Sequence, residues 1–331
     1  MNKIATLRVG VDGIERNLDD IRDYLAGEIE EEIRTRLCTL SGRLVNFPEQ
    51  GLVDTIIADL PVILKASPTE LKRRADAIDA NQQGVFCTKN NGHWGSTALG
   101  TALLEAFNYQ NYRKTVLVEV ARRLNVKTCP YCNMHYTLYA NEKKKRTTAK
   151  LVRFQFDHFF DKMRYPMLSM SFYNLIPSCS VCNQGKSSRH LSLVYHPYAS
   201  DICNQFHFEL TDPLGPYTSA RVNDEVEISL VPEVGVNQQE FDDYVNTFHL
   251  KSLYSRHGDV VQEVFDKAYE DPYYHNPENF IFLSSRATDY LKRLWLGNYV
   301  KQEEIEKRPL AKFMQDMWKQ AKGRKLLDGD I

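Results

Sequence analysis

Two short stretches, CPYCN at 129–133 and CSVCNQGK at 179–186, decide how this chain is expected to fold. Each contains two cysteines separated by two residues, a spacing at which a tight turn can bring both sulfur atoms to one ion. Zn²⁺ prefers four thiolate or imidazole ligands in tetrahedral geometry, so the two pairs together predict one structural zinc. The alternative is that all four side chains are ordinary buried thiols. The expected ligands are Cys129, Cys132, Cys179 and Cys182.

The segment between the cysteine pairs is too long for a compact zinc finger, so it must have structure of its own. MHYTLYA (134–140) and LVRFQF (151–156) are rich in aromatic and β-branched residues. We expect them to form a hairpin whose tip is the charged run NEKKKRTTAK. NLIPS (174–178) predicts a further short strand, and a short helix is expected from Asn183 onward.

Outside this block the chain is expected to be mainly helical, since apolar residues recur at helical spacing, as from Ile14 to Leu37. The glycines within 84–96 predict a loop. QFHFELTD (205–212) and EVEISLVPE (225–233) predict two strands. Further helices are expected at 52–64, from Ser67, and at 97–107, 112–124, 240–270, 283–299 and 302–322.

The predicted fold class is therefore α+β, with a zinc-stabilised ββα-metal core between mainly helical regions. We assign the core to 106–200. Residues 1–105 form a helical region that could bind a partner, and 201–331 form a mixed region of strands followed by helices.

Composition sets limits on the class of protein. The 331 residues are 43% hydrophobic and 26% charged, which provides enough apolar material for a sizeable core. The net charge of -1 excludes a polycation, so contact with nucleic acid must come from a local basic surface. We see no signal peptide and no apolar run of membrane-spanning length. We expect a cytoplasmic protein, in which paired cysteines bind metal rather than form disulfides.

Four side chains within the block have the chemistry of a metal-dependent phosphodiester-cleaving site. Such hydrolysis needs a base that activates water and a cation at the scissile phosphate. The carboxylate of Asp157 and the amide oxygen of Asn183 are hard ligands that suit Mg²⁺ or Mn²⁺. His158 suits the general base, and a nearby amide such as Asn174 could fix its ring. Neighbours on a regular strand face opposite sides, so Asp157 and His158 can share a site only if the strand ends, bends or bulges there.

The order Asp157-His158, Asn174, Asn183 between two CxxC pairs resembles the HNH endonuclease motif in its H-N-N form. The run CPYCN…FDHFFDK…NLIPSCSVCNQGKSS is similar to the HNH subunit of Septu-type and retron-associated anti-phage systems. Residues 106–200 carry this resemblance. One departure is DHFFDK where related sequences have DHxxPK, so that Asp161 replaces a proline.

The resemblance implies that His158 is the general base, that Asp157 and Asn183 hold the divalent ion, and that Asn174 orients the His158 ring. It also implies an effector of anti-phage defence that acts with an ATPase. The chain itself has no Walker A motif, so that ATPase would be a separate partner. Two alternatives stay open: a non-catalytic zinc module that binds nucleic acid or a protein partner, and an RNase with the same site.

Basic residues gather around the predicted core. Lysine and arginine contacts to phosphate supply affinity for nucleic acid without reading its sequence. We expect nucleic acid, DNA more than RNA, to bind here, with a solubilising loop as the alternative. The expected contacts are Lys143, Lys144, Lys145, Arg146 and Lys186.

Overall fold

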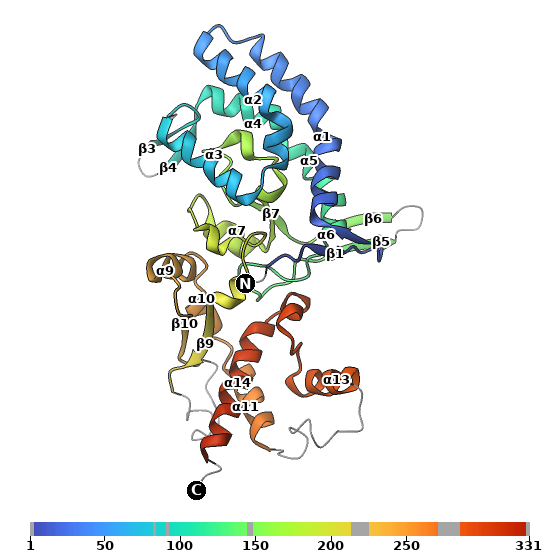
Figure 1. Ribbon diagram of the computed structural model, residues 1–331, viewed down its shortest axis with the longest axis vertical. Coiled ribbons are helices and arrows are strands. Elements are labelled where there is room, and N and C mark those ends of the chain that lie inside the picture. Colours follow the sequence, from blue (N-terminus) through green and yellow to red (C-terminus); the bar gives the residue numbers. More distant parts are fainter. Residues whose placement is uncertain are drawn as a thin grey trace. The chain divides into compact units, whose positions relative to one another are not determined.

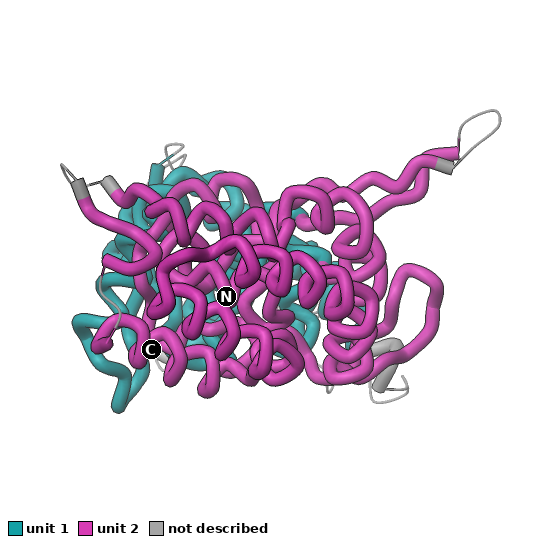
Figure 2. The backbone as a smooth tube through the Cα atoms, turned by 90° about the horizontal axis from the view of Figure 1, so that it is seen from above, with its two compact units in different colours: residues 1–3, 127–136, 201–331 teal, residues 4–126, 137–200 magenta. Residues whose placement is uncertain are grey.

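The computed structural model describes residues 3–81, 84–90, 93–143, 148–212, 225–270 and 285–328 (Figure 1). As predicted, the structure is mixed α+β, and each sheet in these stretches is a small antiparallel pair of strands. No helix described here is long and apolar enough to span a membrane. The chain divides into two compact units, drawn in different colours in Figure 2. Unit 1 comprises Met1–Lys3, Lys127–Tyr136 and Asp201–Ile331, and unit 2 comprises Ile4–Val126 and Thr137–Ser200.

The first long helix of unit 2, α1 (Leu18–Ser41), begins at Leu18 rather than near Ile14. The residues before it form a hairpin of two short strands, β1 (Leu7–Val9) and β2 (Glu15–Asn17). Asn17 then caps α1 in a capping box with Asp20. Most of the predicted apolar stripe is buried, namely Leu18, Ile21, Leu25, Ile29, Ile33 and Leu37, whereas Ile14 lies before the helix and is exposed.

Four more helices of unit 2 lie near their predicted positions: α2 (Phe47–Lys65), α3 (Pro68–Asn81), α4 (Ala98–Phe107) and α6 (Val116–Leu124). The helix expected over 112–124 is divided, because a separate short helix, α5 (Tyr109–Tyr112), precedes α6. Helices α2, α4 and α6 pack against α1. The stretch 84–96, predicted as a loop, instead contains two paired strands, β3 (Cys87–Asn90) and β4 (His93–Ser96).

Two strand pairs and a helix carry the central block. β5 (Tyr139–Lys143) pairs with β6 (Thr148–Val152), β7 (Gln155–His158) pairs with β8 (Leu175–Ser178), and α7 (Ser180–Lys186) follows. The run 151–156 is thus divided between two strands with different partners, so the prediction of one continuous strand was wrong. Helix α7 begins before Asn183, its expected start, because Cys179 caps its first turn.

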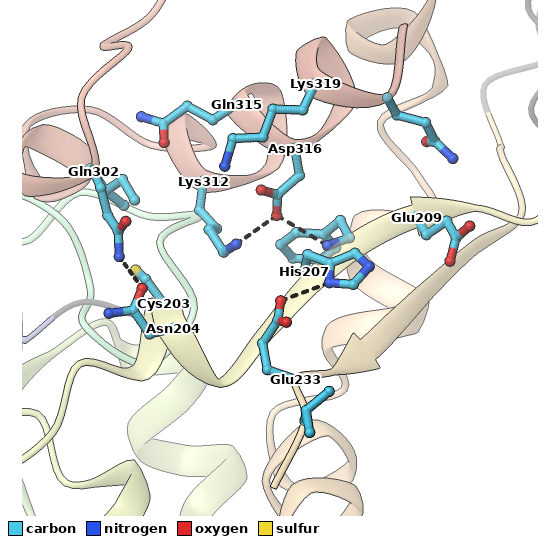
Figure 3. Close-up of a pocket in the computed structure, with 14 residues that line it drawn as sticks. Cys203, Asn204, His207, Glu209, Glu233, Gln302, Lys312, Gln315, Asp316 and Lys319 are labelled. Atoms are coloured by element: carbon cyan, nitrogen blue, oxygen red, sulfur yellow. Dashed lines mark hydrogen bonds and ion pairs between the residues drawn. The ribbon is translucent and has the colours of Figure 1, made fainter. Parts of the chain in front are cut away.

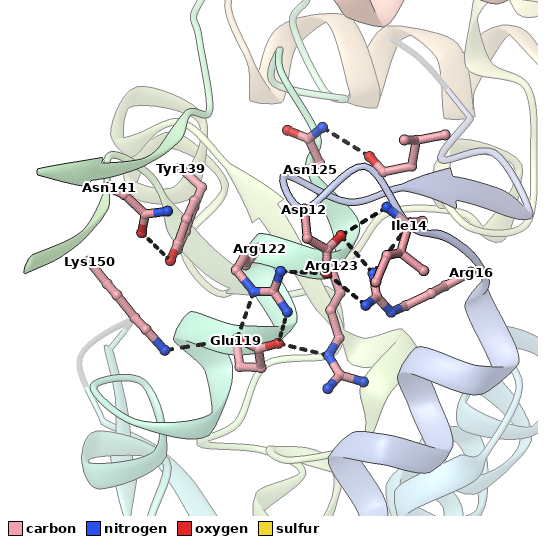
Figure 4. A network of polar contacts seen from close by, with 11 residues as sticks. Asp12, Ile14, Arg16, Glu119, Arg122, Arg123, Asn125, Tyr139, Asn141 and Lys150 are labelled. Atoms are coloured by element: carbon pink, nitrogen blue, oxygen red, sulfur yellow. Dashed lines mark hydrogen bonds and ion pairs between the residues drawn. The ribbon is translucent and has the colours of Figure 1, made fainter. Parts of the chain in front are cut away.

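A network of ion pairs fastens the turn between β1 and β2 to α6 (Figure 4). Asp12 in the turn pairs with Arg122. Arg122 and Arg123 both pair with Glu119, one turn earlier on α6. Lys150 on β6 lies 3.9 Å from the same carboxylate. The network therefore connects the N-terminal hairpin, α6 and β6. Charges shared in such a network stabilise a fold more than isolated surface ion pairs do.

Unit 1 combines one strand pair with several helices. The two predicted strands are present, and β9 (Phe206–Leu210) pairs with β10 (Ile228–Pro232). The helices are α9 (Gln238–Thr247), α10 (Leu250–Tyr254), α11 (Gly258–Glu270), α13 (Ser285–Leu296) and α14 (Ala311–Asp328). Helix α14 packs against β9 and α11. Phe208, Tyr254 and Phe313 form an aromatic cluster in the core.

A polar cavity of about 730 Å³ lies beside β9 in unit 1 (Figure 3). In its wall, Lys312 pairs with Asp316 at 2.7 Å, and Asp316 accepts a hydrogen bond from the backbone N of Phe208. His207 and Glu233 lie 2.8 Å apart. These contacts tie α14 to β9, and β9 to the residue after β10, so a structural role accounts for these polar side chains.

Candidate metal centre and active-site pocket

The first cysteine pair lies in a tight turn of unit 1. The backbone N of Asn133 donates to the carbonyl oxygen of Cys129 at 2.8 Å, and Asn133 adopts a left-handed backbone with φ 51°. The backbone N of Met134 donates to Cys132 Sγ at 3.4 Å. Such N–H···S contacts favour the thiolate, which is the form of cysteine that binds metal.

The second cysteine pair begins α7 in unit 2 and has the same backbone turn, but here the first cysteine accepts the N–H···S contact. The backbone N of Cys182 donates to Cys179 Sγ at 3.4 Å. The backbone N of Asn183 donates to the carbonyl oxygen of Cys179 at 3.0 Å. In each pair, the residue after the second cysteine closes the turn onto the first. Both pairs therefore have the local geometry expected of a metal-binding knuckle.

All four cysteines are buried, and their Sγ atoms lie within 4.8 Å of one another. Four sulfurs at tetrahedral corners, about 2.3 Å from a zinc ion, are about 3.8 Å apart, so this spacing suits one ion. Buried thiolates are costly unless a cation offsets their charge. The predicted cluster of four cysteines is confirmed, and its donor set fits a structural zinc.

His158 lies at the end of β7, opposite Leu175. Its side chain is buried, with Nε2 3.0 Å from the carbonyl oxygen of Ser169 and its ring edge-on to Tyr109 at 4.6 Å. A carbonyl oxygen can only accept, so Nε2 carries the proton and Nδ1 carries the lone pair. Burial, with a smaller contribution from the charge of Lys162, lowers the pKa of His158 to about 3. The ring is therefore neutral at neutral pH.

Asp157, beside His158, is paired with a lysine inside the protein. Lys186 is 0% exposed, and its Nζ lies 3.2 Å from Asp157 Oδ2 and 2.7 Å from the carbonyl oxygen of His158. A buried ammonium group requires such partners. Lys186 thus supports Asp157 and His158 from within, instead of being an exposed contact for phosphate as the sequence predicted.

Asn174 is fully buried, and its amide holds the segment that follows β7. Its Nδ2 donates to the carbonyl oxygens of Phe160 and Leu168, at 3.1 and 2.9 Å, and its Oδ1 accepts from the backbone N of Phe160 at 2.7 Å. Both amide hydrogens are used in these bonds. The same segment leads to Ser169, which binds the His158 ring. Asn174 is therefore placed to orient His158 through this segment rather than by direct contact.

A cavity of about 430 Å³ in unit 2 brings Asp157, His158 and Asn183 together. Asp157 and His158 both reach the cavity because β7 ends at His158. The sequence predicted that the two residues could share a site only if the strand ended, bent or bulged at this point. Asn183 donates from Nδ2 to Gln155 Oε1, so its own Oδ1 is the atom that could bind a cation. Asp161 also lines the cavity, and it accepts a hydrogen bond from the backbone N of Met163 at 3.0 Å.

The predicted hairpin contacts for nucleic acid are described only in part. Lys143 is exposed at the end of β5. Lys144, Lys145 and Arg146 lie outside the described residues, so their role stays a prediction. The cations that line the cavity are instead Arg113, Lys114 and Lys162.

The position of Lys186 could have been predicted from the sequence, whereas the positions of Arg113 and Lys114 could not. Lys186 follows Asn183 by three positions on α7, so a helix places both on one face, and this spacing could have been used. Arg113 and Lys114 lie far from Asp157 along the chain. No local pattern signals that they share its cavity.

Comparison with known proteins gives no match to a family model, to a curated protein or to a solved structure. The chemistry of the cavity therefore has to be inferred from its own residues. They combine a neutral buried imidazole, carboxylate and amide oxygens, and several cations around one space.

Proposed function

We propose that this chain is a metal-dependent endonuclease that hydrolyses phosphodiester bonds of nucleic acid, with DNA preferred to RNA. The observation that carries the proposal is that Asp157, His158 and Asn183 line one cavity. These are residues that the HNH resemblance marks as functional. The strands β7 and β8 followed by α7 have the order of a ββα-metal core, and the four-cysteine cluster suits a structural zinc beside it.

His158 would act as the general base. Its Nε2–H is held by the carbonyl oxygen of Ser169, so Nδ1 is the atom that would take a proton from water. The lowered pKa keeps this nitrogen unprotonated, but it also weakens the base. A bound phosphate beside Lys162 would offset the positive charge that disfavours the imidazolium ion, which raises the basicity of His158 where it is needed.

The oxygen ligands for a divalent ion would be the Asp157 carboxylate and Asn183 Oδ1. Mg²⁺ or Mn²⁺ bound there would supply positive charge to the scissile phosphate and to the leaving oxygen. The two hard oxygens fit such an ion. The Asp157 carboxylate would have to share its charge between the ion and Lys186. Asn174 would keep the segment from Phe160 to Leu168 in place around the reacting groups.

The biological setting proposed for this activity is anti-phage defence, with a separate ATPase as partner. Its support is the resemblance to the HNH subunit of Septu-type and retron-associated systems. Control by a partner is reasonable for a nuclease that selects little by sequence, because uncontrolled cleavage would harm the host.

The test is nicking of supercoiled plasmid with and without Mg²⁺ or Mn²⁺. His158→Ala should lower the rate by about 10²–10⁴-fold, the contribution typical of a general base. His207→Ala is the matched control, because His207 is a partly exposed histidine that pairs with Glu233 in unit 1. The His207→Ala protein should nick plasmid at the normal rate. Digestion of tRNA beside the plasmid separates DNase from RNase. Equal nicking by His158→Ala and the parent protein would refute the assignment of the base.

The competing function is a zinc module without catalysis, and one observation favours it. The Asp157 carboxylate already has an ammonium partner in Lys186, which could make a divalent ion unnecessary. Such a module would bind nucleic acid or protein but nick no plasmid at any concentration of divalent ion. The plasmid assay therefore separates the two functions.

A further inference from the structure

Within the part of the chain that the structure describes, three cations line the cavity of His158 without forming an ion pair. Arg113 and Lys114 follow α5 in the turn that leads to α6, and Lys162 follows β7. Within the described stretches, the charged groups of these three side chains form neither ion pairs nor hydrogen bonds. Lys162 Nζ only lies over the ring of Tyr109, 4.9 Å from its centre. By contrast, Arg122 on the adjacent α6 is paired with two carboxylates.

The cavity therefore has an excess of positive charge. Of the two aspartates among its described lining residues, Asp157 is already matched by Lys186, which leaves Asp161 to face the three cations. Burial lowers the pKa of Lys162, and the charge of Arg113 lowers it further, although Asp161 opposes this effect. Like charges that repel one another at the wall of a cavity are stabilised when an anion enters it.

We propose that Arg113 and Lys114 form a clamp that binds the phosphates of a nucleic-acid backbone and presents it to His158. The proposal rests on the proposed function and names two of its substrate-binding residues. The guanidinium of Arg113 matches a phosphate through two parallel N–H donors, and Lys114 adds a point charge beside it. Both side chains are exposed on a turn, where they can meet a polymer too large to enter the cavity. Contact with phosphates makes the binding independent of base sequence and sensitive to salt.

The clamp is tested by binding, without cleavage. Fluorescence anisotropy of a labelled 30-base-pair duplex is measured on His158→Ala protein without added divalent ion, over a series of NaCl concentrations. Adding Arg113→Ala and Lys114→Ala should weaken binding at least about tenfold, and the slope of log Kd against log salt should become shallower by about 2. The charge-matched control adds Arg43→Ala and Lys251→Ala, which remove two exposed cations elsewhere. It should bind within about twofold of the parent.

Three results would overturn the clamp. One is unchanged affinity and slope in the Arg113→Ala/Lys114→Ala protein. Another is an equal loss in the control, which would indicate a general charge effect. The last is binding of polyglutamate in preference to DNA, which would indicate an acidic protein ligand. Thermal unfolding of each variant verifies that the substituted turn leaves the fold intact.

A nicking assay separates failure of the clamp from failure of the proposed function. With His158 present, Arg113→Ala/Lys114→Ala should raise KM about tenfold and leave kcat within about threefold, because the clamp binds substrate without touching the reacting atoms. An unchanged KM in an active enzyme would refute the clamp and leave the nuclease standing. Clamp-dependent DNA binding by a parent protein that never nicks would refute the nuclease and leave the clamp standing.

Discussion

At the scale of single residues, the buried ammonium group of Lys186 sets the charge beside Asp157. It contacts both the Asp157 carboxylate and the carbonyl oxygen of His158, and it is excluded from solvent. A divalent ion bound at Asp157 must therefore compete with a charge that the protein already holds there. The ion pair between Asp157 and Lys186 stabilises the fold but weakens the binding of a divalent ion to the same carboxylate. Lys186 should therefore affect both the stability of the fold and the concentration of divalent ion that the proposed activity requires.

We expect Lys186→Met to lower the free energy of unfolding by about 3–5 kcal/mol, because it leaves the Asp157 carboxylate buried without its partner. Methionine keeps most of the length of lysine without its charge. Urea unfolding followed by circular dichroism measures the loss. The control is Asp157→Asn combined with Lys186→Met, which removes both charges and should recover more than half of it. If the loss of unfolding free energy in the double variant equalled the sum of the losses in Asp157→Asn and Lys186→Met, the interaction between Asp157 and Lys186 would contribute nothing to stability.

The residues of the site were predictable from the sequence to different degrees. Asp157, His158 and Asn183 share the cavity, as their spacing around the cysteine pairs indicates. The indirect position of Asn174 was not predictable, because its partners Phe160 and Leu168 are backbone groups that any sequence would provide. Every residue has a backbone carbonyl oxygen, so the type of residue that accepts such a hydrogen bond does not reveal the bond.

At the scale of elements, regular periodicity predicted well and chain reversals did not. Helix α1 was found from its buried stripe, and only its start was wrong, because the hairpin before it takes the first apolar position. The pair β3–β4 was missed because glycine and asparagine suit a loop and a hairpin equally. The break between β6 and β7 was missed because strand propensity does not reveal where a strand changes its partner.

The ion-pair network around α6 makes stability depend on pH through Glu119. Hydrogen bonds from Arg122 and Arg123 lower the pKa of Glu119 from its ordinary value of 4.5 to about 2, in spite of partial burial. Between these values the unfolded chain binds a proton that the folded chain does not, so stability rises with pH across this window. The contribution is complete above pH 4.5 and is lost as the pH falls toward 2.

We therefore expect Glu119→Gln to lower the free energy of unfolding by about 2 kcal/mol at pH 7, and by progressively less below pH 4.5. Denaturant unfolding of both proteins at pH 3, 4, 5 and 7 measures the difference. Glu31→Gln is the control, since that glutamate is exposed on α1 and is not one of the residues that form the network. A difference between parent and Glu119→Gln that stays constant with pH would contradict the lowered pKa.

At the scale of the whole molecule, the four cysteines set the condition under which the site can exist. A zinc ion bound to all of them closes the chain between Cys132 and Cys179 into a loop. That loop contains β7 and β8, and with them Asp157, His158 and Asn174. Closing a long loop removes conformations from the unfolded chain, and the energy of binding zinc becomes energy of folding. A zinc ion at this cluster and the proposed chemistry would therefore be linked, although the cysteines would take no part in the proposed reaction.

Loss of zinc should consequently unfold this block rather than merely slow catalysis. Purified protein should contain about one zinc per chain, and Cys129→Ser or Cys179→Ser should reduce this to less than half, lower the melting temperature and abolish nicking together. Cys38→Ser is the matched control, because Cys38 is an exposed cysteine of α1. This variant should keep both its zinc content and its melting temperature. Mass spectrometry of the metal content and thermal unfolding supply the two measurements. Full stability in a protein that contains no zinc would contradict the link, since four buried thiols would then hold the fold without a cation. Normal zinc content in Cys179→Ser would instead show that the ion does not need all four sulfurs.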